Sequence, residues 1–144
     1  MRTLILSIVF FTSISFSFSQ LNYTESEIQK TALLVKNIPK AAQRNTASLV
    51  SEINKIGKTE RIKTLAIYEW ITHNISYDTK ALVKNNLQQL SADEVIKSQA
   101  AVCSGYAAVF KALATGLGLE CELIEGYAKG YGYEPGTIIE ETNH

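Results

Sequence analysis

The 144-residue sequence has few of the residues that build disulfide frameworks or interrupt secondary structure, since it contains two cysteines and two prolines. It also lacks a charge imbalance, because 14 lysines and arginines match 14 aspartates and glutamates. No basic cluster is present, which argues against nucleic acid as a partner. No apolar run approaches the roughly 20 residues of a membrane span, so no membrane anchor is expected. The 46% of hydrophobic residues instead predicts one modest domain with a packed core.

The N-terminus has the composition of a secretory signal. Arg2 supplies a positive charge and residues 4–11 (LILSIVFF) are apolar. Ser17 and Ser19 are the small residues that a signal peptidase recognises. We therefore expect residues 1–19 to be removed and the protein to be secreted or periplasmic.

Apolar residues recur at helical spacing through most of the remaining chain. The predicted helices cover residues 21–36, 42–56, 60–74 and 103–116, with a short helix after the capping box of Ser91 and Glu94. The broad apolar side of residues 60–74 predicts more than one packing neighbour, and the long helix over 103–116 is apolar enough to be buried all round. Residues 76–90 are expected to be an irregular connection.

The C-terminal part has the pattern of strands. Residues 120–128 predict a strand, residues 129–136 a turn, and residues 137–144 the approach to a second strand. Helices followed by an antiparallel sheet indicate an α+β fold. Such a sheet would lack further strands, which suggests a chain truncated before the sheet is complete.

Cys103, at the predicted start of the long helix, has two interpretations. A lone cysteine among small residues is often a buried packing residue. A helix start also stabilises a thiolate through its unpaired N–H groups and dipole, and the same groups can hold an oxyanion. A disulfide to Cys121 is not expected, because a helix about 20 Å long separates two Cα atoms that must approach within about 7 Å.

A nucleophilic cysteine needs a base, and the sequence offers His73 and His144. His73 lies near a helix end, where it is expected to face solvent or to act as a cap. A strand over residues 121–128 extends about 23 Å at about 3.3 Å per residue, which returns the chain to the Cys103 end of the helix. His144 by itself is an ordinary terminal residue, but beside Cys103 a catalytic pair is favoured.

Cys103 and His144 could also bind a metal. Two ligands do not make a closed zinc site, so no metal or cofactor is predicted.

The segments around these residues match a known family in combination. Residues 101–130 (AVCSGYAAVFKALATGLGLECELIEGYAKG), the later Thr-Asn-His of residues 142–144, and residues 67–78 (IYEWITHNISYD) resemble the transglutaminase-like superfamily, nearest to its kyphoscoliosis-peptidase branch. The resemblance covers residues 58–144 and leaves residues 20–57 as an N-terminal helical region. It implies a papain-like α+β domain in which Cys103 is the nucleophile and His144 the general base.

The resemblance also implies an activity and a missing part. An acyl-enzyme thioester would pass to water, as in a peptidase or amidase, or to an amine, as in a transglutaminase. The family's triad acid follows the histidine, whereas both aspartates here, Asp78 and Asp93, precede Cys103. This polypeptide is therefore expected to be inactive, and the full-length protein to act on a protein or peptide substrate. The alternative is a non-catalytic interaction module that keeps the fold.

The family pattern assigns roles to further residues. Trp70, Tyr77 and Asp78 belong to the upstream motif, where they are expected to pack and to fix a loop. Ser104 beside the nucleophile, and Tyr127 and Lys129 near the turn, are the expected substrate-cleft residues, although the last two would equally suit an ordinary hairpin surface.

Overall fold

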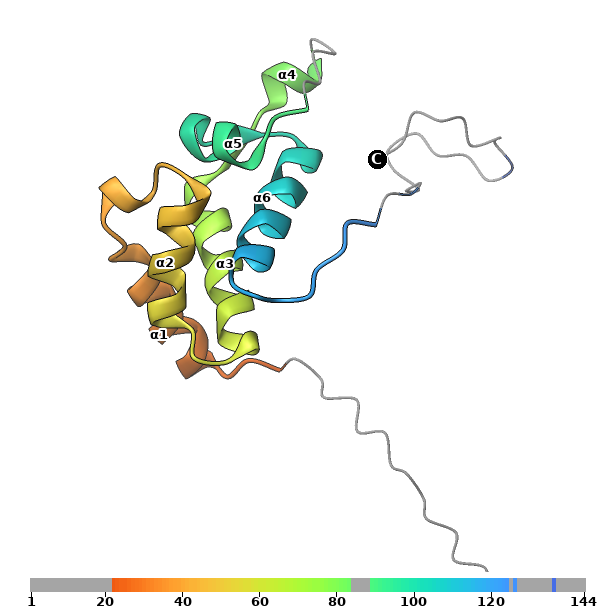
Figure 1. The fold of residues 1–144 in the computed structure, drawn as a ribbon. Coiled ribbons are helices and arrows are strands. Elements are labelled where there is room, and N and C mark those ends of the chain that lie inside the picture. The colour runs from red at the N-terminus through yellow and green to blue at the C-terminus, as the bar shows by residue number, and fades with distance from the viewer. Residues whose placement is uncertain (1–21, 84–88, 125, 127–135, 137–144) are drawn as a thin grey trace, which may run out of the picture.

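The computed structural model describes residues 22–83, 89–124, 126 and 136. Its elements follow in the order α1 (Glu25–Lys36), η1 (Lys40–Ala42), α2 (Thr46–Ile56), α3 (Glu60–Asn74), β1 (Ser76–Tyr77), α4 (Thr79–Val83), α5 (Ala92–Ser98), β2 (Ala100–Ala101) and α6 (Cys103–Gly116) (Figure 1). The predicted signal segment, the predicted turn over 129–136 except for Gly136, and the second strand over 137–144 lie outside the described residues.

Side-chain caps fix where four of the helices begin. Thr24, Asn45, Thr59 and Ser91 each accept a hydrogen bond from a backbone N–H of the first turn of α1, α2, α3 and α5. The capping box predicted at Ser91 and Glu94 is confirmed. The first two helices begin later than predicted, because the caps at Thr24 and Asn45 set their start and η1 precedes α2.

The connection over residues 76–90 is more ordered than predicted. It contains β1 and the short helix α4, and Asp78 Oδ1 accepts a hydrogen bond from the N–H of Ala81 at 2.9 Å. An aspartate before a helix is a standard N-cap, so the prediction of an irregular segment missed a readable signal.

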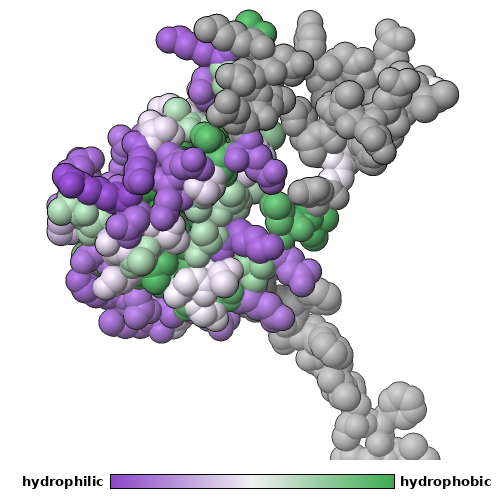
Figure 2. Space-filling model, turned by 45° about the horizontal axis from the view of Figure 1, so that its top comes forward, coloured by the Kyte–Doolittle hydropathy of each residue, from purple (hydrophilic) through white to green (hydrophobic). Residues whose placement is uncertain are grey.

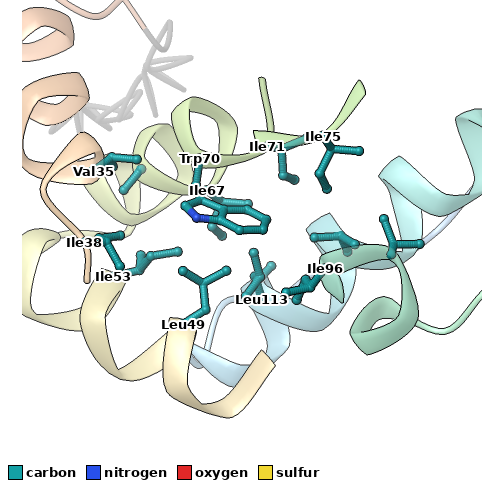
Figure 3. Close-up of a cluster of buried hydrophobic side chains, with 14 of the residues drawn as sticks. Val35, Ile38, Leu49, Ile53, Ile67, Trp70, Ile71, Ile75, Ile96 and Leu113 are labelled. Atoms are coloured by element: carbon teal, nitrogen blue, oxygen red, sulfur yellow. The ribbon is translucent and has the colours of Figure 1, made fainter. Parts of the chain in front are cut away.

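The core lies where the apolar sides of α1, α2, α3, α5 and α6 meet. Helix α3 contacts α1, α2 and α6, which confirms the prediction that it has several neighbours. Figure 3 places Trp70 in the middle of the cluster, with Leu49, Ile53 and Leu113 nearby. All four side chains are fully buried, so this cluster is where truncation of a side chain is most destabilising.

The polar atoms in this core are satisfied. Trp70 Nε1 donates to Gln43 Oε1 at 3.2 Å, and Gln43 Nε2 donates to the Ile38 carbonyl at 2.7 Å. Among the side chains that the structure describes, no buried nitrogen or oxygen lacks a hydrogen-bond partner. The indole is therefore held in one orientation as well as buried.

The sheet among the described residues was not predicted. β1 and β2 form a two-stranded parallel sheet in which Ser76 pairs with Ala100 and Tyr77 with Ala101. Residues 120–124, the described start of the predicted strand, form no strand. A strand needs a neighbour for its backbone hydrogen bonds, and none of the described residues supplies one there. The described fold is thus mostly helical.

The prediction that the 103–116 helix is buried all round is wrong for the described residues. Helices α2, α3 and α5 pack against α6, but Cys103, Ser104, Lys111 and Thr115 are exposed. Alanines cannot distinguish a covered face from an open one, because they suit both. Figure 2 shows pale green apolar surface between the polar regions on the face turned to the viewer. No helix within the described ranges is long and apolar enough to cross a membrane.

Candidate active site

Cys103 is the first residue of α6 and is exposed. The interpretation of Cys103 as a buried packing residue is therefore wrong. Cys121 is partly buried against the core, and no disulfide joins the two thiols, as predicted. Of the two cysteines, the one predicted to be the nucleophile is the more exposed residue.

The start of α6 differs from the other long helices. Its N-cap residue is Val102, whose side chain makes no capping hydrogen bond, whereas α1, α2, α3 and α5 are each capped by a side-chain oxygen. The amides of Gly105 and Tyr106 both turn inward to the Val102 carbonyl, at 2.9 and 3.3 Å. Because Val102 has no acceptor atom in its side chain, the N-cap residue itself does not offset the positive end of the helix dipole beside Cys103.

Close packing fixes the position of this first turn. A Cβ at Gly105 would lie 2.5 Å from the Cβ of Ala101 and 3.2 Å from Cγ2 of Val95. Only glycine lets α6 approach β2 and α5 so closely. The backbone that carries Cys103 is thus pressed against the parallel strand pair.

A long-range hydrogen bond also fixes the position of the first turn of α6. Tyr106 Oη donates to the Ile75 carbonyl at 2.8 Å, which joins the first turn of α6 to the end of α3. Burial raises the pKa of Tyr106, with a smaller contribution from Tyr77, so the hydroxyl keeps the proton that it donates. The sequence reasoning assigned Gly105 a role only as one of the small residues around the cysteine, and it assigned Tyr106 no role at the site. The positions of Gly105 and Tyr106, two and three residues after the cysteine, were the available signal.

Tyr77 and Asp78 lie next to the strand that leads into Cys103. Asp78 N–H donates to the Ala101 carbonyl at 2.9 Å, while its carboxylate caps α4. The ring of Tyr77 stacks on that of Tyr106, with centroids 6.2 Å apart and planes at 29°, yet Tyr77 remains 45% exposed. Trp70, the third residue of the upstream motif, is instead in the core.

Of the remaining candidate site residues, the structure describes Ser104 and His73. Ser104 is exposed beside Cys103. His144, Tyr127 and Lys129 lie outside the described residues, so their roles stay predictions. His73 is exposed on the last turn of α3, where its Nδ1 lies 2.8 Å from the Glu69 carbonyl. Because a carbonyl only accepts, Nδ1 is the donor in this contact.

Two further features of the described residues do not belong to this site. A surface groove of about 570 Å³ lies between α1, η1 and the end of α3; His73 is among the residues that line it, and Cys103 and Ser104 are not. Within the described ranges, no three His, Cys, Asp or Glu side chains gather in a way that would hold a metal ion.

Comparison with known proteins assigns the chain to a family. The family model described as the transglutaminase-like superfamily matches residues 47–144, which is more than half of the chain. The chain belongs to the transglutaminase-like superfamily. The match begins in α2 and extends through β1, β2 and α6, so the thiol lies inside the family domain.

Two curated relatives are similar to this transglutaminase-like chain. Kyphoscoliosis peptidase of Homo sapiens is 32% identical over 95 residues, and kyphoscoliosis peptidase of Mus musculus is 32% identical over 88 residues. The matches cover 66% and 61% of this chain but only 14% and 13% of the relatives. The similarity is therefore distant and spans a small part of those proteins. No solved structure matches the chain.

Proposed function

We propose that this protein is an exported transglutaminase-like cysteine enzyme that acts on amide bonds of a protein or peptide. The observation that carries the proposal is the exposed Cys103 at the start of α6, where the N-cap residue Val102 makes no side-chain capping bond. Membership of the superfamily adds the expectation of acyl chemistry, and the name of the relatives, kyphoscoliosis peptidase, supports a peptide substrate.

The reaction would follow from the thiol and a base. His144 would take the Sγ proton of Cys103, and the thiolate would attack the amide carbonyl to form a tetrahedral oxyanion. The N–H groups at the start of α6 would stabilise that oxyanion. The C–N bond then breaks, the imidazolium gives its proton to the leaving amine, and a thioester remains on Cys103. Water or a second amine would release the acyl group.

A non-catalytic interaction module is the second candidate, and one observation favours it. The carboxylate of Asp78 caps α4, and that of Asp93 accepts hydrogen bonds from the backbone N–H and hydroxyl of Thr46. Both aspartates of the sequence thus have structural roles. Neither Asp78 nor Asp93 is then available as the orienting acid, whose removal lowers kcat by roughly 10⁴ in the analogous serine enzyme.

The antiparallel sheet of the expected papain-like fold would cover the open face of α6. Three partly buried alanines, Ala107, Ala108 and Ala112, lie on this helix, and Leu123 and Ile124 are 44% and 91% exposed after it. Covering these side chains would remove apolar surface from water. Amide hydrogen exchange of residues 120–144 in the full-length protein tests this: protection supports the sheet, and exchange at the rate of an unstructured chain contradicts it.

Trapping of the acyl-enzyme separates the two candidate functions. The full-length protein is incubated with a casein substrate, with and without a dansylated alkyl amine, and is quenched in acid for intact-mass analysis. The enzyme predicts a thioester adduct on the wild type and on Cys121→Ala, together with casein cleavage or amine incorporation. It predicts none of these with Cys103→Ala. A folded wild type without adduct or product favours the interaction module.

A further inference from the structure

Tyr77 is an exposed aromatic ring beside the thiol, and the described contacts leave much of it uncovered. One side of the ring is covered by its stacking on Tyr106, while the side chain as a whole is 45% exposed. Tyrosine, with an apolar ring and a polar hydroxyl, is a side chain that is enriched at binding interfaces. The other described rings near Cys103 do not share this exposure, since Tyr106 is partly buried.

The register of the strand pair places this ring close to Cys103. Tyr77 pairs with Ala101, two residues before Cys103, and the next residue, Asp78, donates to the Ala101 carbonyl at 2.9 Å. Tyr106, on which the ring stacks, is three residues after Cys103 on α6. Residues three apart on a helix have Cβ atoms about 5–6 Å from one another. The spacing therefore places Tyr106 near Cys103 on α6, and the stacking places Tyr77 against Tyr106.

The ring is also held in place, as a binding surface must be. Tyr106 is fixed by its hydrogen bond to the Ile75 carbonyl at 2.8 Å, and β1 is fixed by backbone hydrogen bonds to the segment that contains β2. A rigid aromatic side chain loses little conformational entropy when it binds a partner. The pair can thus select a ligand and does not need to rearrange around it.

We propose that Tyr77, supported by Tyr106, determines specificity by stacking on an aromatic or branched aliphatic side chain of the acyl-donor peptide, next to the carbonyl that Cys103 attacks. The inference rests on the proposed function, because it takes Cys103 as the nucleophile. A peptide positioned in this way would bring its carbonyl to the start of α6, and peptides with small or charged side chains there would lose the contact.

Affinity labels that differ only in the side chain test the proposal. The full-length protein is treated with the chloromethyl ketones of N-acetyl-phenylalanine, N-acetyl-leucine and N-acetyl-glycine, and with iodoacetamide as a reagent without a side chain. Sγ displaces the halide in each case, so peptide mapping gives the labelling rate of Cys103. We expect the phenylalanine reagent to label about three- to tenfold faster than the glycine reagent, the range that aromatic contacts supply.

Matched variants test whether the preference for the phenylalanine reagent depends on Tyr77. Tyr77→Ser should lose the preference for phenylalanine while its iodoacetamide rate is unchanged, and Tyr77→Phe should keep it. Tyr68→Ser, which removes a tyrosine that is 58% exposed on α3, is the control and should behave as the wild type. If Tyr77→Ser does not fold, the test rests on two results: the wild type must prefer the phenylalanine reagent to the glycine reagent, and Tyr77→Phe must keep this preference.

The outcomes distinguish this proposal from the proposed function. If iodoacetamide labels Cys103 no faster than Cys121, the nucleophile assignment fails, and the specificity proposal fails with it. If Cys103 is reactive but the reagents label it at equal rates, or Tyr77→Ser keeps the wild-type preference, the specificity proposal alone is overturned. Equal rates would be the result if another part of the chain covers Tyr77.

Discussion

The hydroxyl of Tyr106 donates to the carbonyl of Ile75 across 31 positions of the sequence, at 2.8 Å. This bond joins the turn that carries Cys103 to the point where α3 ends and β1 begins. The position of the thiol thus depends on an element that precedes it by many residues, as well as on its own helix.

Tyr106→Phe should weaken this connection without changing the shape of the side chain. The Ile75 carbonyl would lose its hydroxyl donor, which costs about 0.5–1.5 kcal/mol for a typical hydrogen bond. Urea denaturation should show a lower midpoint with an unchanged slope. Tyr68→Phe, at an exposed position on α3, is the matched control. Equal midpoints for both variants and the wild type would contradict the role given to Tyr106.

Gly105→Ala should displace the first turn of α6. The new methyl group would lie 2.5 Å from the Ala101 Cβ, and overpacking of this kind costs about 1–3 kcal/mol. Gly126→Ala is the control, because nothing lies within 4 Å of a Cβ placed there. Thermal unfolding should separate the two variants. A Gly105→Ala protein as stable as Gly126→Ala would mean that α6 is not pressed against β2.

Leu113→Ala should be strongly destabilising, because the side chain is fully buried in the core around Trp70. Truncation of a buried leucine costs about 2–5 kcal/mol, including the cavity that it leaves. Leu33→Ala removes the same atoms from a side chain that is 61% exposed, so it should change the free energy of unfolding by less than about 0.5 kcal/mol. Similar values for the two variants would refute the position of the core.

Acid should destabilise the contact between α1 and α3. Hydrogen bonds from Arg61 and from Thr24 lower the pKa of Glu27 from 4.5 to about 2. As the pH falls, the Glu27 carboxylate of the unfolded chain is protonated near pH 4.5, before that of the folded chain. The contribution of Glu27 to folding stability is therefore complete above about pH 4.5 and is lost as the pH falls toward 2. In Glu27→Gln the melting temperature should depend less on pH in this window. Parallel curves for the variant and the wild type would contradict the assignment.

The sequence predicted the features that depend on neighbouring residues. The capping box at Ser91 and Glu94, and the start of a helix at Cys103, could be read because each signal lies within a few positions. The family resemblance was likewise carried by contiguous motifs. The absence of a disulfide between Cys103 and Cys121 followed from the length of one helix.

Features that depend on distant residues were not predicted. β1 and β2 have two residues each, too few for a period-two pattern to be visible. The bond from Tyr106 to Ile75 and the stacking of Tyr77 require knowledge of which segments meet. The open face of α6 was missed because alanine carries almost no information about its partner.

Alkylation of Cys103 tests the central claim most directly. The full-length protein and its His144→Ala variant are treated with iodoacetamide at pH 6, and peptide mapping gives the separate rates for Cys103 and Cys121. A thiolate formed at the start of α6 with help from His144 predicts that Cys103 reacts about tenfold or more faster than Cys121, and that His144→Ala removes most of this difference. Equal rates for the two cysteines, or a Cys103 rate unaffected by His144→Ala, would contradict the account.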